Sequence, residues 1–188
     1  MKKSLIIGLC FLFILTACTE KDVYDAIENI KISDEFQPQP KYTSDISGPY
    51  LVSKITDGDT FHVIIDGKDE TIRLIGIDTP ETVSPTKPIQ CFGPEASAKA
   101  KELLENKSVY LETDSSQGFT DRYDRLLRYA LIDNGPNNAT SFNSYMIENG
   151  YAKEYTYDKA YKYQDVFKKL EIQANGNKAG LWGACNEE

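Results

Sequence analysis

Three short apolar, β-branched runs follow one another between residues 50 and 77, and only two tight turns separate them. The runs 50–55 and 60–65 flank the glycine turn "TDGDT", and "DGK" at 66–68 is typical of a β-hairpin. The third run covers 70–77, where Ile72 and Leu74 share one face and Arg73 lies on the other. The sequence therefore predicts a three-stranded meander with acidic residues at its strand ends.

The rest of this region adds two further strands and three helices. Strands are predicted at 108–113 and 125–132, from runs of apolar and aromatic residues. Helices are predicted at 92–106, at about 141–149 and around 163–174, where helix start and stop signals or apolar residues at helical spacing occur. Five short antiparallel strands with a helix between the third and the fourth favour an α+β fold, a closed five-stranded β-barrel of the OB type with three α-helices.

The first 17 residues have the pattern of an export signal. Lys2 and Lys3 precede an apolar run from Leu5 to Leu15, which is too short to span a bilayer as a permanent helix. "LTAC" at 15–18 resembles a bacterial lipobox, which implies a lipid on Cys18 and a location at the extracytoplasmic face of the cell membrane. An ordinary secretory signal with an incidental cysteine is the alternative.

Residues 18–48 are expected to form a flexible tether, because acidic residues outnumber lysines there and no apolar periodicity is sustained. About thirty flexible residues have an end-to-end distance of roughly 30 Å, enough to hold a domain clear of lipid headgroups. Residues 49–188 are then expected to form one domain, which is long enough to bury a core.

The four cysteines reduce to one candidate pair. Cys10 leaves with the signal and Cys18 would carry the lipid, which leaves Cys91 and Cys185. Two cysteines in a chain exported to an oxidising environment favour one disulfide. In the chain-entropy model, closing so long a loop contributes roughly 4 kcal/mol to stability. Two free buried thiols are the alternative.

Six motifs lie along the domain in this order: "DGDT", "RLIGIDTPET", "FGPEASAKAK", "DRYDRLLRYA", "NGYAKEY" and "AGLWGAC". In their order and spacing they resemble the staphylococcal nuclease (thermonuclease) family, and the resemblance covers residues 50–185. It implies an OB-fold barrel with three helices. It also implies a Ca²⁺-dependent phosphodiesterase that cuts DNA and RNA at the 5′ P–O bond and leaves 3′-phosphates.

By this resemblance, the metal ligands would be the carboxylates of Asp59 and Asp78 and the backbone carbonyl of Thr79. A cation there has a physical reason, because neighbouring carboxylates repel each other and raise each other's pKa until a cation relieves the repulsion. Oxygen ligands favour Ca²⁺ or Mg²⁺ over zinc. Taken singly, Asp59 could be a turn residue and Asp78 an Asx-turn residue.

The resemblance also assigns the chemistry. Glu81 would be the base that takes a proton from the attacking water, and its place three residues after Asp78 suits a group near the metal. Arg73 and Arg125 would contact the scissile phosphate, where a guanidinium can form two parallel hydrogen bonds. Surface salt bridges are the alternative role for both arginines.

A second set of residues is expected to bind the substrate. Tyr155 and Tyr157 resemble the two tyrosines that line the nucleotide pocket in the family, and Lys87 lies in the loop beside it. Arg122 is expected to add local positive charge. Asp124 stands where the family usually has glycine, so a positive φ is expected just before Arg125, and aspartate tolerates this conformation better than most residues.

The charge of the domain is unusual for a protein that binds a polyanion. Residues 49–188 contain 16 Lys and Arg against 22 Asp and Glu, a net charge of about −6. Binding is therefore expected to depend on the few basic residues at the site, and to be weaker than in a basic relative. A non-catalytic OB-fold lipoprotein that binds nucleic acid or another partner, or a purely structural lipoprotein, is the alternative. No protein partner is predicted, and a monomer is expected.

Overall fold

The computed structural model describes residues 45–82, 88–132 and 140–185, with Thr140 described by its backbone alone. All of them belong to the compact unit Gln39–Glu188. The predicted signal at 1–17, the lipidation site Cys18, the tether up to residue 44 and Lys87 lie outside the described residues. Across the three described stretches, no helix has the length and apolar character that crossing a membrane requires.

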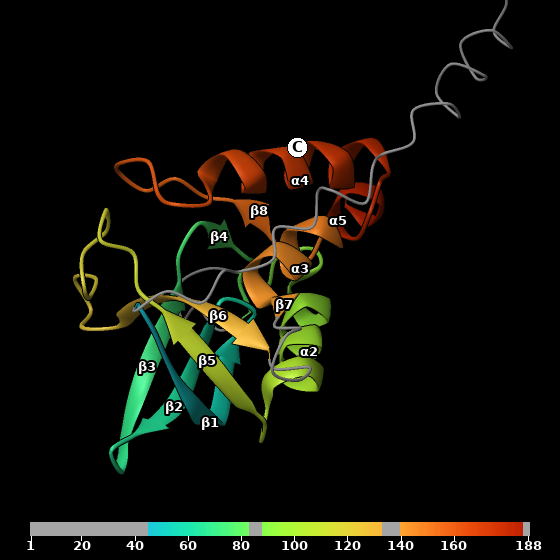
Figure 1. The fold of residues 1–188 in the computed structure, drawn as a ribbon. Coiled ribbons are helices and arrows are strands. Elements are labelled where there is room, and N and C mark those ends of the chain that lie inside the picture. The colour runs from blue at the N-terminus through green and yellow to red at the C-terminus, as the bar shows by residue number, and fades with distance from the viewer. Residues whose placement is uncertain (1–44, 83–87, 133–139, 186–188) are drawn as a thin grey trace, which may run out of the picture. The chain divides into compact units, whose positions relative to one another are not determined.

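Five strands form a closed barrel (Figure 1). They are β1 (Ile46–Asp57), β2 (Thr60–Ile65), β3 (Lys68–Leu74), β5 (Ser108–Glu112) and β6 (Leu126–Ile132). They are neighbours in the order β3-β2-β1-β5-β6, and a parallel pairing between β3 and β6 closes the barrel. The short strand β7 (Thr140–Ser141) pairs with β6. The predicted α+β fold with a five-stranded OB-type barrel is confirmed.

The register of the first three strands sets the position of the turn between β1 and β2, which carries Asp57 and Asp59 and is called the acidic turn below. Thr60 at the start of β2 is opposite Asp57 at the end of β1, and it is also opposite Arg73 on β3. The turn between β1 and β2 therefore lies beside the end of β3. At its other end, β1 begins at Ile46, so the domain start expected at residue 49 falls inside this strand.

The strand predicted at 70–77 is wrong as a single element. It divides into β3, which ends at Leu74, and β4 (Ile77–Asp78), which pairs with β8 (Lys153–Glu154). The break lies at Gly76, whose φ of 78° favours glycine. A Cβ at this position would lie 2.5 Å from Tyr161, so the backbone must pass close to that ring. The break turns Asp78 away from the barrel sheet and into the separate β4–β8 pair.

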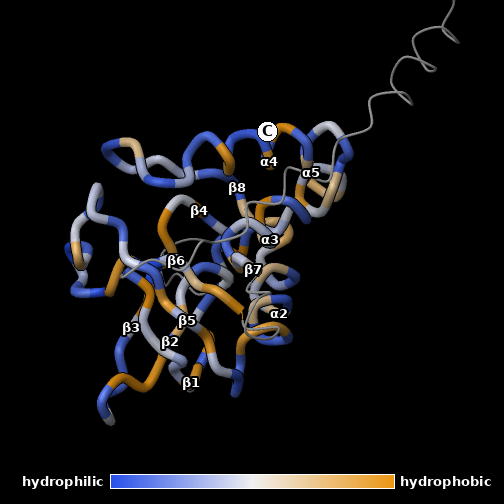
Figure 2. Tube along the Cα trace, viewed as in Figure 1, coloured by the Kyte–Doolittle hydropathy of each residue, from blue (hydrophilic) through white to orange (hydrophobic). Residues whose placement is uncertain are grey.

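Three helices pack beside the barrel, and their bounds agree with the predicted helices within two residues. They are α2 (Gly93–Leu104), α3 (Phe142–Glu148) and α4 (Gln164–Gly176). A single helical turn, α5 (Leu181–Ala184), was not predicted. The core between barrel and helices includes the fully buried Phe61, Tyr129, Phe142 and Phe167. Figure 2 shows hydrophobic residues along strands such as β2 and β6 and hydrophilic residues at the outer turns.

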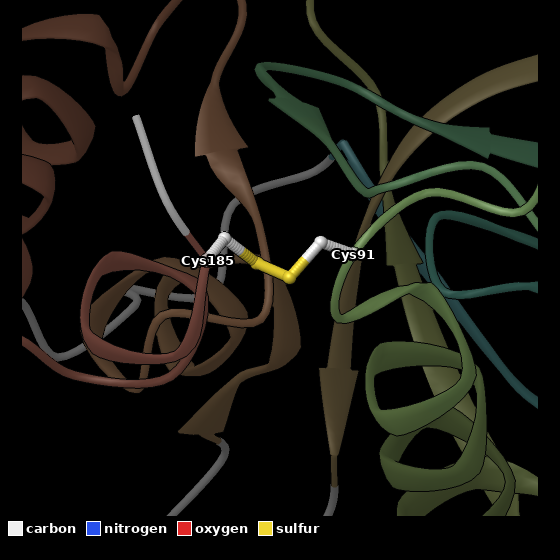
Figure 3. Close-up of a disulfide and its surroundings, with 2 residues drawn as sticks. All are labelled: Cys91 and Cys185. Carbon is white, nitrogen blue, oxygen red and sulfur yellow. A yellow bond between two sulfur atoms is a disulfide. The ribbon is translucent and has the colours of Figure 1, made fainter. Parts of the chain in front are cut away.

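Cys91 and Cys185 form a disulfide, which confirms the predicted pairing (Figure 3). Their Cα atoms are 5.9 Å apart, although 94 positions separate them in the sequence. Cys91 lies two residues before α2 and Cys185 directly follows α5. The bridge therefore joins the start of the first helix to the last helical turn of the described chain.

Candidate active site

Asp59 is a buried carboxylate held at the turn between β1 and β2. Its residue is 7% exposed, and its Oδ1 accepts a hydrogen bond from the Thr60 hydroxyl at 2.9 Å. Its Oδ2 accepts one from the backbone N–H of Thr79 at 3.0 Å. Gly58 permits this arrangement, because a Cβ there would lie 2.8 Å from the side chain of Thr79. The acidic turn and the segment after β4 are therefore packed directly against each other.

Arg73 joins the two carboxylates that the sequence places at separate strand ends. Its Nη2 lies 3.2 Å from Oδ2 of Asp59 and 2.8 Å from Oδ1 of Asp78. Its Nη1 donates to the backbone carbonyls of Leu74 and Ile77, at 2.9 and 2.8 Å. The arginine side chain is only 13% exposed, whereas that of Asp78 is 55% exposed. The backbone carbonyls thus fix one side of the guanidinium, and the exposed Asp78 lies on its other side.

Arg125 approaches the same cluster from the segment before β6. Its Nε and Nη2 contact Oδ2 of Asp121 at 2.8 and 2.6 Å, and its Nη1 lies 3.5 Å from the Thr60 hydroxyl. Because Thr60 also donates to Asp59, one hydroxyl connects Arg125 to the acidic turn. Burial alone would raise the pKa of Asp121, but hydrogen bonds from Arg125 and neighbouring backbone groups lower it below its ordinary value.

The expected positive φ at Asp124 is confirmed, at 60°. Asp121 supports this turn, since its Oδ1 accepts hydrogen bonds from the backbone N–H groups of Tyr123 and Arg125, at 2.9 and 3.1 Å. Aspartate therefore occupies the conformation for which glycine is favoured, and Arg125 still reaches the cluster.

Glu81 lies on a segment that is tied to the acidic turn. The hydroxyl of Thr82 donates to Oδ1 of Asp57 at 2.9 Å, and the backbone N–H of Thr82 donates to Oε1 of Glu81 at 3.1 Å. Burial raises the pKa of Asp57, and the nearby charges of Asp59 and Glu81 raise it further against the hydrogen bonds that it accepts. The segment that carries Glu81 therefore lies close to the turn that holds Asp57 and Asp59.

The donor set fits a hard divalent cation. Asp59 and Asp78 both contact one nitrogen of Arg73, so their carboxylates converge on one region rather than on remote surfaces. The hydroxyl oxygen of Thr79 is buried and accepts or donates no hydrogen bond among the described residues, which leaves an unused oxygen next to Asp59. Within those same residues no three His, Cys, Asp or Glu side chains form a metal cluster. Any cation here would therefore need carbonyl or water oxygens in addition.

Two of the residues expected to bind the substrate, Tyr155 and Tyr157, form an exposed aromatic pair. Tyr155 and Tyr157 are 42% and 75% exposed, and their ring centroids are 6.3 Å apart. The backbone N–H of Tyr155 donates to the carbonyl of Gly76 at 3.0 Å, which links the pair to the segment that leads to Asp78. Arg122 lies over the ring of Tyr123 and donates to its hydroxyl at 2.8 Å.

Sequence reasoning missed several members of this site. Thr60 connects Asp59 to Arg125, and Gln90 binds the backbone of Glu81. The guanidinium groups of Arg122 and Arg125 both lie over the ring of the exposed Tyr123. Tyr123 lies inside the motif "DRYDR" and could have been found there. Gln90 carries no such signal, because its partner is nine residues away in the sequence.

Comparisons with known proteins show that the chain is similar to nucleases. A family model described as "Staphylococcal nuclease homologue" matches residues 71–184. The chain is 36% identical to the thermonuclease of Staphylococcus intermedius over 146 residues, which are 77% of this chain and 83% of that protein. It is 39% identical to the thermonuclease of Staphylococcus hyicus over 133 residues, or 71% and 75% of the two chains. A shorter match, 40% identical over 82 residues (44% and 38%), is to the endonuclease YncB of Bacillus subtilis strain 168.

Proposed function

Because this chain belongs to the staphylococcal nuclease family and is therefore a nuclease, we propose that it hydrolyses DNA and RNA as a Ca²⁺-dependent endonuclease. Cleavage would take place at the 5′ P–O bond and leave 3′-phosphates. The observation that carries the proposal is the contact of a single guanidinium, that of Arg73, with both Asp59 and Asp78. It gathers anionic oxygens for a cation and a donor for a phosphate in one place.

Asp59, Asp78 and the carbonyl of Thr79 would hold the Ca²⁺. When bound, Ca²⁺ supplies positive charge that neutralises the carboxylates and polarises a phosphate oxygen. The fixed position of Asp59 supports this role, since two hydrogen bonds already hold its carboxylate at the turn. Asp78 is more exposed and would face the solvent side of the site.

Glu81 would accept the proton of the attacking water. The carboxylate is held near the acidic turn through Thr82, which donates both to Glu81 and to Asp57. A positioned general base contributes about 10²–10⁴-fold to the rate of such a reaction. The proton leaves the water as its oxygen attacks phosphorus, opposite the departing 5′ oxygen.

Arg73 and Arg125 would stabilise the charge on the equatorial phosphate oxygens. Nη1 of Arg73 donates to two backbone carbonyls, and these bonds would hold the guanidinium in place while Nη2 exchanges a carboxylate partner for a phosphate oxygen. Arg125 is held by Asp121 in the same way. Donors that are fixed before the reaction need no reorganisation in the transition state.

The tyrosines and basic residues would hold the rest of the substrate. The exposed rings of Tyr155 and Tyr157 offer faces on which a base can stack, and base stacking contributes about 1–3 kcal/mol per base. Arg122 would contact a neighbouring phosphate, and Lys87 would add a second positive charge. The enzyme would act as a monomer.

We further propose that the enzyme is held at the extracytoplasmic face of the cell membrane by a lipid on Cys18. The support is the sequence "LTAC" at 15–18 after an apolar run that follows two lysines. Labelling of the expressed chain with a radioactive fatty acid tests this, with Cys18→Ala as the control. Secretion of unlabelled wild type would favour the ordinary signal instead.

Digestion of plasmid and single-stranded DNA tests the enzyme assignment. Wild type should cut both with Ca²⁺ and neither with a chelator, and Glu81→Gln should lower the rate by about 10²–10⁴-fold. Glu148→Gln, an exposed position on α3, is the matched control and should keep the rate of wild type. Equal rates for wild type and Glu81→Gln would refute the base assignment. Nucleic-acid binding without any cleavage would favour the non-catalytic module.

A further inference from the structure

Gln90 holds the backbone of the proposed catalytic base. Its Oε1 accepts a hydrogen bond from the N–H of Glu81 at 2.7 Å, and its own N–H donates to the carbonyl of Glu81 at 2.9 Å. Both main-chain polar groups of Glu81 therefore bond to one residue. Gly93 adds a close packing contact, because a Cβ there would lie 2.9 Å from the carbonyl oxygen of Glu81. The segment 90–93 thus sets where Glu81 lies.

The disulfide acts directly on that segment, since Cys91 follows Gln90. At the other end of the bridge the chain is firmly anchored. Leu181 is buried and its N–H donates to the carbonyl of Gly150 at 2.9 Å, while a Cβ on Gly180 would lie 2.3 Å from the same oxygen. The bridge therefore connects a fixed C-terminal turn to the residue beside Gln90 (Figure 3).

Gln90 and Cys91 are exposed, and apart from the bridge the start of α2 is held by the buried Gly93 and by the ring of Phe92, which lies 5.6 Å from that of Tyr151. Phe92 is the N-cap residue, but its side chain makes no capping hydrogen bond and its φ is 67°. The body of the helix is held differently, because Ala96, Ala100 and Leu104 are buried against the core. Breaking the bridge should therefore loosen the first residues of the segment while the helix and the barrel stay folded.

We propose that the Cys91–Cys185 disulfide controls catalysis by redox state: the intact bridge keeps Gln90 in place, Gln90 positions Glu81, and reduction lowers the turnover. This inference rests on the proposed function, because it takes Glu81 as the base. Gln90 is a positioning residue in this scheme and touches no reacting atom. Nothing in the scheme requires the bridge to bind substrate, so the effect belongs to kcat and not to KM.

Reduction of the disulfide needs a dithiol reductant. Such a reductant can reach the bridge because Cys91 is exposed to solvent. One thiolate of the dithiol attacks a sulfur of the bridge, the S–S bond breaks, and a mixed disulfide forms with one cysteine. The second thiol of the reductant then displaces that cysteine. Two electrons and two protons end on Cys91 and Cys185, and the dithiol is oxidised to its own disulfide.

Redox control of this kind would make the nuclease activity depend on the compartment in which the protein is found. In a reducing cytoplasm the two cysteines stay as thiols, and in an oxidising environment outside it the bridge forms. A nuclease arranged in this way would turn over slowly before export, where its substrates include the DNA of its own cell, and fully after it.

Steady-state cleavage of DNA with saturating Ca²⁺ tests the proposal on the full chain, before and after treatment with dithiothreitol. Reduction should lower kcat by about 10–100-fold with KM changed by less than about threefold, because a base displaced by about 1 Å loses that much. The double variant Cys91→Ser/Cys185→Ser should show the same low kcat with or without reductant. Circular dichroism should show that all forms remain folded at the assay temperature.

Gln90→Met tests the positioning step with the bridge intact. It keeps the length of the side chain but lacks the oxygen that accepts from Glu81, so kcat should fall part of the way to that of reduced wild type, because the backbone N–H of residue 90 still donates to the carbonyl of Glu81. Reduction of this variant should lower kcat only to the level of reduced wild type, since both changes act on the position of Glu81. Gln90→Glu retains an acceptor oxygen and should recover most of the kcat. Gln173→Met, at an exposed position on α4, is the matched control.

The outcomes separate this inference from the proposed function. If Glu81→Gln lowers kcat but reduction and Gln90→Met do not, the redox control is refuted and the base assignment stands. A further loss on reducing Glu81→Gln would also refute it, because the bridge would then act elsewhere. If Glu81→Gln is as active as wild type, the base assignment is refuted and this inference fails with it, whereas wild type that cleaves nothing in any redox state would refute the proposed function itself.

Discussion

Gly76 lies where the strand is interrupted between β3 and β4, and Gly67 lies in the hairpin between β2 and β3. Alanine substitutions at these two glycines form a matched pair that tests how packing around Gly76 positions Asp78. Both glycines have nearly the same positive φ, 78° and 77°. A Cβ at Gly67 would meet no atom within 4 Å, whereas one at Gly76 would lie 2.5 Å from the ring of Tyr161 and 2.9 Å from that of Phe167. The two alanine variants therefore share the backbone strain and differ in the collision.

The expected magnitudes follow from these contacts. An L-residue in the left-handed region costs about 1–2 kcal/mol, which is the whole effect expected for Gly67→Ala. Overpacking adds about 1–3 kcal/mol, so Gly76→Ala should lower the free energy of unfolding by about 2–5 kcal/mol. Tyr161 cannot easily move aside, because it is 6% exposed and its hydroxyl donates to Glu154 at 2.8 Å.

Urea unfolding of both variants measures the stability, and the Ca²⁺ concentration that gives half-maximal cleavage measures the site. Gly76 lies two residues before Asp78, and its carbonyl accepts from the backbone N–H of Tyr155 at 3.0 Å. Gly76→Ala should therefore require more Ca²⁺, whereas Gly67→Ala should not. Equal destabilisation by the two substitutions would refute the argument, because the rings would then impose no constraint on the break.

Substitutions at three further positions probe the contacts of the site and the acid stability of the barrel. Arg73→Lys should lower kcat by about 10²–10³-fold in the cleavage assay, because an ammonium group cannot reproduce the fixed fork of donors. Thr60→Val removes the hydroxyl that connects Arg125 to the acidic turn and should cost about 1–3 kcal/mol in urea unfolding, whereas Thr60→Ser should recover most of it. Burial alone would raise the pKa of Asp114, but hydrogen bonds, the largest from the backbone N–H of Lys162, lower it below its ordinary value of 3.8. The charged form of Asp114 therefore stabilises the fold above that pH and loses this effect as the pH falls through the lowered pKa, so Asp114→Asn should be less stable at pH 7 and the gap to wild type should close in acid.

Local signals were sufficient for most of the barrel. The turn residues around Gly58 and Gly67 indicate where β1 ends, where β2 begins and ends, and where β3 begins. The break at Gly76 was not predictable in this way, since the apolar pattern continues on both sides of it. What selects the break is the ring of Tyr161, 85 residues later in the chain, which packs where a side chain would lie.

The candidate site shows the same division. Asp59, Asp78 and both arginines could be named from the motifs, and the structure brings them together. The connections among them depend on contacts across the fold, such as that of Thr60 with Arg125. The disulfide could be predicted because only two cysteines remain once Cys10 and Cys18 are assigned to the predicted signal and lipobox. Cys91 follows Gln90 in the sequence, but the contact of Gln90 with Glu81, nine residues away, follows from the fold and from no local pattern.

The acidic character of the domain is compatible with a nuclease because attraction and catalysis depend on different charges. At an ionic strength of 0.1 M, charges more than about 10 Å apart are largely screened, so the net charge has little influence on one phosphate at the site. The side chains of Arg73 and Arg125 are only 13% and 28% exposed, and fixed guanidinium groups in such surroundings bind a phosphate more strongly than exposed lysines do. If these arginines contact the reacting phosphate as proposed, their effect would be concentrated there. Contacts that stabilise the transition state more than the bound substrate would favour turnover at the expense of general affinity for nucleic acid.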